Sequence, residues 1–218
     1  MLLDGQTDGG IVYGLGVVNG RFDDAPDFNN SKHILTRLGW AGEKASVLAN
    51  LLWGNNDIND ADPGITVDLV ATFDPTDSLS TWMNFTWSQN MNQPGPVDTS
   101  EGWGIAAAAR YAFTDALGLA LRAEYIADSD NFFGVTQPGV VPGPATDIDA
   151  VSLTVTGDYA ITDSLTLKGE VRWDWMDSQT GGSDNFLSNG ADALLIQNAA
   201  NYSNDNQWLT GLELVYQF

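Results

Sequence analysis

The stretch Trp208-Leu209-Thr210-Gly211-Leu212-Glu213-Leu214-Val215-Tyr216-Gln217-Phe218 ends the chain, and its apolar and polar side chains largely alternate. Because successive side chains of a β-strand point to opposite faces of a sheet, this alternation predicts a strand with one apolar and one polar face. An alternating last strand that ends in phenylalanine is typical of a bacterial outer-membrane β-barrel, whose strands need no long apolar run. The rest of the chain repeats the pattern.

Nine further segments alternate, so ten strands are predicted, most of them near the ~9 to 11 residues that a tilted membrane strand needs. Tight turns rich in Asp, Gly, Pro and Thr alternate with long polar loops, which predicts one all-β, antiparallel, up-and-down transmembrane barrel over residues 1–218 with its short turns in the periplasm. The predicted strands are 11–19, 33–40, 45–54, 65–73, 79–88, 102–113, 118–127, 151–161, 165–176 and 208–218. The predicted tight turns are 41–44, 74–78, 114–117 and 162–164, and the predicted loops lie near 20–32, 55–64, 89–101, 128–150 and 177–207.

The two faces of these strands differ in chemistry. In 165–176 the odd positions are Leu, Gly, Val and Trp, whereas the even positions up to 174 are Thr, Lys, Glu, Arg and Asp. We expect the polar row to line the lumen and the apolar row to contact lipid. Leu35, Leu48 and Leu52 interrupt the polar rows of the early strands. The predicted pore-lining residues, five basic and six acidic, are Arg37, Asp68, Arg110, Arg122, Glu124, Asp158, Lys168, Glu170, Arg172, Asp174 and Glu213.

Aromatic residues lie at strand ends, which favours a membrane barrel over a soluble β-sandwich or lipocalin-like barrel. Tyr and Trp prefer the headgroup zone, whereas a soluble core would hold its aromatic residues at mid-strand. Two girdles are predicted. The one at the long-loop end contains Trp53, Trp87, Trp103, Tyr125, Trp175 and Trp208, and the one at the short-turn end contains Trp40, Phe73, Phe113, Tyr159, Tyr216 and Phe218.

The net charge of -21, with only eight basic residues, argues against a nucleic-acid partner. The chain has no cysteine, so thiolate sites are excluded, and no cofactor is expected. Many acids fall in the predicted loops, where we expect them to concentrate cations at the outer mouth. A weak Ca²⁺ or Mg²⁺ site at Asp57, Asp60 and Asp62, with Asn59 nearby, could bridge the loops to lipopolysaccharide, but the cluster lacks EF-hand spacing, so a solvated acidic loop is the favoured interpretation. The loop acids are Asp23, Asp24, Asp27, Asp57, Asp60, Asp62, Asp128, Asp130, Asp147 and Asp149.

The segments 16–20, 68–73, 121–125 and 212–218, together with the Thr-Asp-Ser-Leu turns, resemble the OmpL-like putative β-barrel porin family over nearly the whole chain. The resemblance implies an outer-membrane barrel with a pore, and it implies no catalytic residues that could be carried over to this chain. It also implies further N-terminal strands, twelve in all, in a full-length parent. We interpret Met1–Leu3 as the tail of an absent strand and 4–10 as a periplasmic turn. This start lacks the basic and apolar regions of a signal peptide, which indicates a mature, truncated or re-engineered terminus.

These features predict a porin for passive diffusion of small hydrophilic solutes or ions, and not an enzyme. The alternatives are a structural or interaction barrel with an occluded lumen that displays acidic extracellular loops, and an omptin-like hydrolase that would use His33 at the rim. The expected partners are outer-membrane lipid, lipopolysaccharide and, through Phe218, the barrel-assembly machinery; the barrel could also form homo-oligomers. The turns at 162–164 and 74–78 predict that Lys168 lies opposite Asp158 and Asp68 opposite Asn84.

Overall fold

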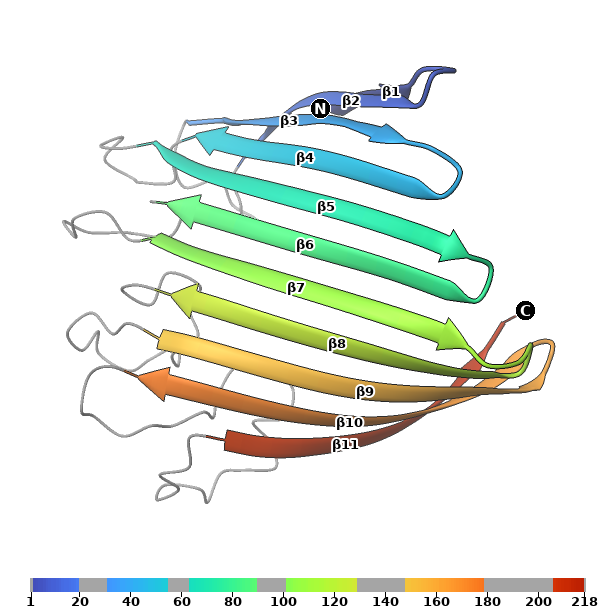
Figure 1. The fold of residues 1–218 in the computed structure, drawn as a ribbon. Coiled ribbons are helices and arrows are strands. Elements are labelled where there is room, and N and C mark those ends of the chain that lie inside the picture. Colours follow the sequence, from blue (N-terminus) through green and yellow to red (C-terminus); the bar gives the residue numbers. More distant parts are fainter. Residues whose placement is uncertain are drawn as a thin grey trace.

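The computed structural model describes residues 2–19, 31–54, 63–89, 101–128, 148–178 and 206–217, which form strands and turns. Eleven strands make one antiparallel sheet in which every strand pairs with its neighbours in sequence (Figure 1). The predicted all-β, up-and-down fold is therefore confirmed. The sheet is not closed, and its edge strands β1 and β11 run in the same direction because strand direction alternates. The strands are β1 (Leu2–Gln6), β2 (Ile11–Val18), β3 (His33–Ala41), β4 (Ala45–Gly54), β5 (Gly64–Thr76), β6 (Leu79–Gln89), β7 (Glu101–Ala112), β8 (Leu117–Asp128), β9 (Ile148–Thr162), β10 (Leu165–Ser178) and β11 (Asn206–Tyr216).

The ten predicted strands correspond to β2–β11, with bounds that differ by no more than three residues. The interpretation of the first ten residues is corrected, because Asp4 and Gly5 belong to a strand and not to a turn. All five residues of β1 pair with β2, from Leu2 opposite Gly16 to Gln6 opposite Val12. Asp and Gly are depleted in strands, so the local sequence does not predict β1. The pairing with β2 stabilises this strand. Within the described part of the chain, no helix has the length and apolar character needed to cross a membrane.

In three tight turns a threonine hydroxyl accepts a hydrogen bond from a backbone N–H two or three residues further along the chain. Thr76 Oγ1 accepts a hydrogen bond from the backbone N–H of Leu79 at 3.1 Å, and Thr114 Oγ1 accepts one from Leu117 at 3.0 Å. Thr162 Oγ1 accepts one from Ser164 at 3.3 Å. These bonds satisfy backbone donors that the turn withdraws from the strand ladder, which explains why the phrase Thr-Asp-Ser-Leu or Thr-Asp-Ala-Leu recurs.

The register predictions have different outcomes. Lys168 pairs with Asp158, as predicted, although Leu165 pairs with Thr162 across an irregularity beside the turn. Asp68 pairs with Thr86 and not with Asn84, which lies opposite Val70. Strand β5 continues to Thr76, which pairs with Leu79 after a register shift that follows Phe73, and each β5 residue up to Phe73 therefore pairs two residues further along β6 than the predicted symmetric turn requires. A displacement of two residues keeps Asn84 on the same face as Asp68, because the side-chain period of a strand is two.

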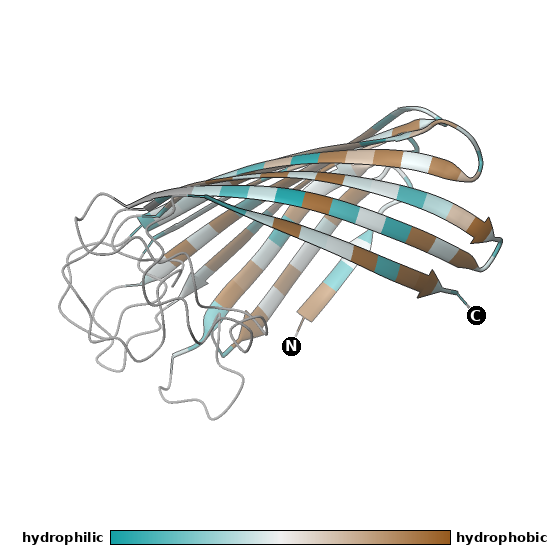
Figure 2. Cartoon of the chain, turned by 90° about the horizontal axis from the view of Figure 1, so that it is seen from below, coloured by the Kyte–Doolittle hydropathy of each residue, from teal (hydrophilic) through white to brown (hydrophobic). Residues whose placement is uncertain are grey.

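Hydrophilic and hydrophobic residues alternate along many of the strands (Figure 2). Because successive side chains point to opposite faces and paired residues share a face, the sheet has a polar face and an apolar face. The polar face is the one that carries Thr166, Lys168, Glu170, Arg172 and Asp174 on β10. Four polar or charged side chains, His33, Ser88, Asp128 and Asp174, are at most 2% exposed, whereas Ala106 is the one buried hydrophobic residue of the described chain. Most exposed large hydrophobic residues lie on the apolar face. A water-soluble fold buries its apolar side chains, so this distribution is the reverse of a soluble one.

Candidate pore surface

All eleven charged residues predicted to line the lumen lie on the polar face. Residues paired across antiparallel strands share a face. Asp158 pairs with Lys168, and Lys168 pairs with Glu213, so these three residues of β9, β10 and β11 lie on the same face. The pairs of the other strands place the remaining charged residues on that face as well, as far as Arg37 on β3. The half-buried residues Leu35, Leu48 and Leu52 also lie on the polar face, as the sequence indicates.

Arg110 and Asp158 form a two-bonded ion pair that crosses a whole strand. Arg110 Nε donates to Asp158 Oδ1 at 2.9 Å, and Nη2 donates to Oδ2 at 2.6 Å. Arg110 belongs to β7 and Asp158 to β9, with Gly118 of β8 between them. A Cβ atom at Gly118 would lie 2.7 Å from Arg110 Cζ and 2.7 Å from Asp158 Oδ1. The pair therefore depends on the missing side chain at position 118.

Asp174 is the centre of a second cluster, near the long-loop end of β10. Its Oδ1 accepts hydrogen bonds from Ser152 Oγ and from Arg172 Nε, both at 2.6 Å, and its Oδ2 accepts one from Gln207 Nε2 at 3.2 Å. Arg172 Nη2 also donates to Ser152 Oγ at 3.0 Å. Asp174 is 1% exposed, so these donors replace the water that a buried carboxylate loses.

A third cluster follows a single register row across β3–β6. Arg37 Nε donates to Asn50 Oδ1 at 2.9 Å, and Asn50 Nδ2 donates to Asp68 Oδ2 at 3.0 Å. Asp68 Oδ1 also accepts from Thr86 Oγ1 at 2.8 Å and from Asn84 Nδ2 at 2.6 Å. The side chains therefore bind one another along the wall of the sheet, from strand to neighbouring strand.

Lys168 lies opposite Asp158 on β9 and Glu213 on β11, and it forms its ion pair with Glu213. Asp158 is bound by Arg110, and Lys168 Nζ instead lies 3.9 Å from Glu213 Oε2 on β11. Glu170, the next polar-face residue of β10 after Lys168, accepts a hydrogen bond from Thr156 Oγ1 at 2.9 Å. Backbone register was predictable from the turn, but the choice of ionic partner was not.

Trp82 was missed as a polar-face residue. It pairs with Ala108, which pairs with Arg122, so the three share one row of the polar face. Arg122 Cζ lies 5.7 Å from the centroid of the Trp82 ring, and Arg122 Nη2 donates to Glu124 Oε1 at 2.8 Å. The signal was present in the sequence, since Trp82 is in phase with Ser80 and Asn84.

The described girdle residues lie on the apolar side. Trp103 stacks near Tyr125 with ring centroids 5.1 Å apart, and near Phe85 at 6.3 Å. Tyr111 and Phe113 meet edge to face at 5.1 Å near the short-turn end. The predicted member Phe218 lies outside the described residues.

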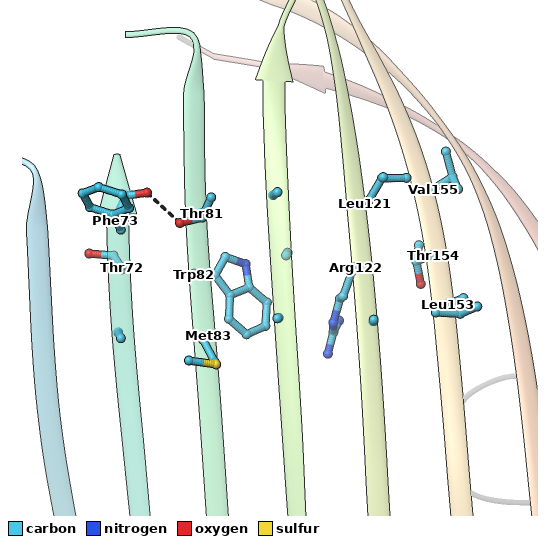
Figure 3. A pocket seen from close by; sticks show the side chains of 15 residues that line it. Thr72, Phe73, Thr81, Trp82, Met83, Leu121, Arg122, Leu153, Thr154 and Val155 are labelled. Carbon is cyan, nitrogen blue, oxygen red and sulfur yellow. Dashed lines mark hydrogen bonds between the residues drawn. The ribbon is translucent and has the colours of Figure 1, made fainter. Parts of the chain in front are cut away.

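A hollow of about 700 Å³ opens on the apolar face of β5–β9 (Figure 3). Its lining comprises two neighbouring rows of residues on the apolar face. The row between these two also lines the hollow, although the side chains of that row point to the polar face. Four alanines supply the small side chains that make the hollow. The apolar rows are Ala71, Met83, Ala107, Ala123 and Leu153, and Phe73, Thr81, Ala109, Leu121 and Val155. The hollow is therefore separate from the charged clusters.

Two of the predicted loop acids belong to strands. Asp128 ends β8 on the polar face and is 2% exposed, and Asp149 lies in β9, where its Oδ1 accepts a hydrogen bond from Tyr125 Oη at 2.8 Å. The strands extend further than alternation predicts, because β-pairing continues past the first polar residues. The other predicted acids, including Asp57, Asp60 and Asp62, lie outside the described residues. Within the described ranges, no group of three metal-binding side chains occurs.

His33 begins β3 on the polar face, is fully buried, and pairs with Val18 on β2.

Comparison with known proteins gives one family. A family model described as putative beta-barrel porin-2, OmpL-like, matches residues 5–218. No curated protein matches the chain. The matched range includes β2–β11 and the charged clusters of the polar face.

Proposed function

Because this chain belongs to the OmpL-like putative β-barrel porin family, we propose that it is a bacterial outer-membrane porin through which small hydrophilic solutes or ions diffuse passively. The separation of the two faces carries this proposal. All eleven charged lining candidates share one face, and the girdle aromatics that the structure describes lie toward the other. Placing the apolar face against lipid and the polar face against water satisfies both surfaces.

The pattern of ion pairs favours an open lumen over a filled one. Arg122 and Glu124 belong to one strand, and Lys168 pairs with Glu213 of the adjacent strand. The Arg110–Asp158 pair spans only the intervening strand. These charges are satisfied along the wall and do not need a partner from across the lumen. We therefore propose that the centre of the barrel holds water and solute.

The charge of the wall supports weak selectivity. The eleven lining candidates, five basic and six acidic, nearly balance, and Asp4 and Asp128 add two acids to the same face, whereas the whole chain carries a net charge of -21. The excess negative charge therefore lies outside this lining, and we place it in the extracellular loops, where it would raise the local cation concentration. The proposed pore conducts both ion signs with a preference for cations.

Planar-bilayer recording of the refolded barrel tests the proposal. Discrete conductance steps in KCl are expected, with a reversal potential under a KCl gradient that shows cation preference. A barrel whose migration on a denaturing gel changes on heating is folded, and silence from such a barrel would favour the occluded, loop-displaying alternative. Loss of a hydrolytic activity in His33→Ala would instead favour an omptin-like enzyme, so that variant is assayed for peptide hydrolysis alongside the wild type.

A further inference from the structure

Trp82 is unusual in its position. Among the Phe, Tyr and Trp side chains of the described strands, it alone lies on the polar face. Ala108 separates it from Arg122 in their common row, and this small side chain lets the indole and the guanidinium meet at 5.7 Å. The Trp82 side chain remains 36% exposed.

Arg122 lies between two groups that recognise organic cations. The Trp82 ring attracts a cation through its quadrupole, and Glu124 Oε1 accepts a hydrogen bond from Arg122 Nη2 at 2.8 Å. The side chains of Arg122 and Glu124 are 44% and 23% exposed, so solvent reaches the pair. An aromatic face with a nearby carboxylate is the chemistry that binds guanidinium and alkylammonium groups.

We propose that Trp82 and Glu124 form a weak binding site for solutes that carry a guanidinium or alkylammonium group, with Arg122 as the resident cation that the solute displaces. This inference rests on the proposed porin function and names a solute class for it. Because Arg122 is tethered, it competes at a high effective concentration and keeps the affinity for solute low. Low affinity suits a conducting pore, in which a solute must leave as readily as it enters.

The test uses Nα-acetyl-argininamide (argininamide below) as the cationic probe. The control is Nα-acetyl-citrullinamide (citrullinamide below), in which an uncharged ureido group replaces the guanidinium and no amine remains to be protonated. Each is added to single channels in KCl, and the concentration that halves the K⁺ current is measured. Argininamide is expected to block and citrullinamide to leave the current unchanged. Trp82→Ala should raise the half-blocking concentration about two- to fivefold, which corresponds to an exposed cation–π contact. Glu124→Gln should raise it as well, because the carboxylate loses its charge.

Arg122→Ala gives the opposite and most specific result. Removing the tethered competitor should lower the half-blocking concentration of argininamide by about twofold or more. Lys168→Ala removes one positive charge from the same face without touching Trp82, and it should produce a smaller shift. Trp87→Ala removes a tryptophan of β6 from the apolar face and should not change the block.

Equal block by citrullinamide, an unchanged block in Trp82→Ala, or equal shifts in Arg122→Ala and Lys168→Ala would each overturn the site. A folded wild-type barrel that does not conduct KCl would instead refute the porin function. The site would then be tested by calorimetric titration of argininamide into detergent-solubilised wild type, Trp82→Ala and Arg122→Ala. Binding that weakens in Trp82→Ala and strengthens in Arg122→Ala would support the site without a pore, and any other ranking would overturn it.

Discussion

Gly118→Ala should destabilise the barrel, although replacing glycine in a strand normally has the opposite effect. A strand glycine costs roughly 0.5 to 1 kcal/mol relative to alanine, so the substitution alone would stabilise. At position 118, however, the added methyl would lie 2.7 Å from Arg110 Cζ and from Asp158 Oδ1. The flexible end of Arg110 must move away, and the two hydrogen bonds of 2.9 and 2.6 Å must break.

The magnitude follows from the exposure of the two partners. The Arg110 side chain is 45% exposed and that of Asp158 is 16% exposed, so solvent screens the pair and we assign about 1 kcal/mol to its loss. Leaving the more buried carboxylate without its donor costs about 1 kcal/mol more. After subtraction of the glycine-to-alanine gain, the free energy of unfolding should fall by about 1 kcal/mol.

Urea unfolding in detergent micelles, followed by tryptophan fluorescence, measures this change. Gly211→Ala is the matched control, because Gly211 also lies on the polar face and no atom would lie within 4 Å of its added Cβ. That variant should be unchanged or more stable. In an Arg110→Ala background, which itself should lose about 2 kcal/mol, Gly118→Ala should become neutral or stabilising. If Gly118→Ala matched Gly211→Ala, or if its effect were the same with and without Arg110, the reasoning would be refuted.

Three further predictions concern other parts of the sheet. Asp174→Ala should lower the free energy of unfolding by about 2 to 3 kcal/mol, because Arg172 and two neutral donors lose a buried acceptor; a loss below that of the exposed-acid variant Glu170→Ala in the same urea assay would contradict the cluster. Leu121→Arg should lower the free energy of unfolding in lipid vesicles by about 2 to 4 kcal/mol, because the charge would face lipid. Ala120→Arg, on the opposite face, should lower it much less, and equal losses in the two variants would contradict the assignment of faces. Thr114→Ala should lower the free energy of unfolding by about 0.5 to 1 kcal/mol, because the turn loses the hydroxyl acceptor, whereas Thr114→Ser should retain most of the stability. Equal losses in the two variants would show that the hydroxyl does not stabilise the turn.

Alternation predicted the strands because it is a local property of each segment. The segment 165–176 contains its own evidence for two faces, and β10 has the expected face assignment. The short strand β1 lacked that evidence, since five residues that include Asp4 and Gly5 do not establish a period. Its partner β2 determines its structure. Register was predictable only where the turn is close to symmetric, as for Lys168 and Asp158, and failed by two residues where an irregularity follows Phe73.

The composition of the charged wall was predictable, but its pairing was not. Face assignment needs only the parity of each position, and parity places Arg110, Asp158 and Lys168 on the same side. The choice of partner depends on which side chains can reach each other across the strands. A large side chain that lies between two charged groups blocks their contact, and a glycine leaves space for it. Asp158 pairs with Arg110 and not with the directly opposite Lys168, because Gly118 leaves the path across β8 free.

The same reasoning assigns a role to Gly14 of β2. Gly14 lies in the row between Asp4 of β1 and Arg37 of β3. A Cβ atom there would lie 3.3 Å from Arg37 Cβ and 3.5 Å from Asp4 Cβ, so a side chain would occupy the space between an acid and a base. At both Gly14 and Gly118, glycine stands on the polar face between residues of opposite charge. At Gly118 the missing side chain leaves room for the Arg110–Asp158 ion pair across the strand, and both glycines should tolerate substitution less well than Gly157, which has no atom within 4 Å of an added Cβ.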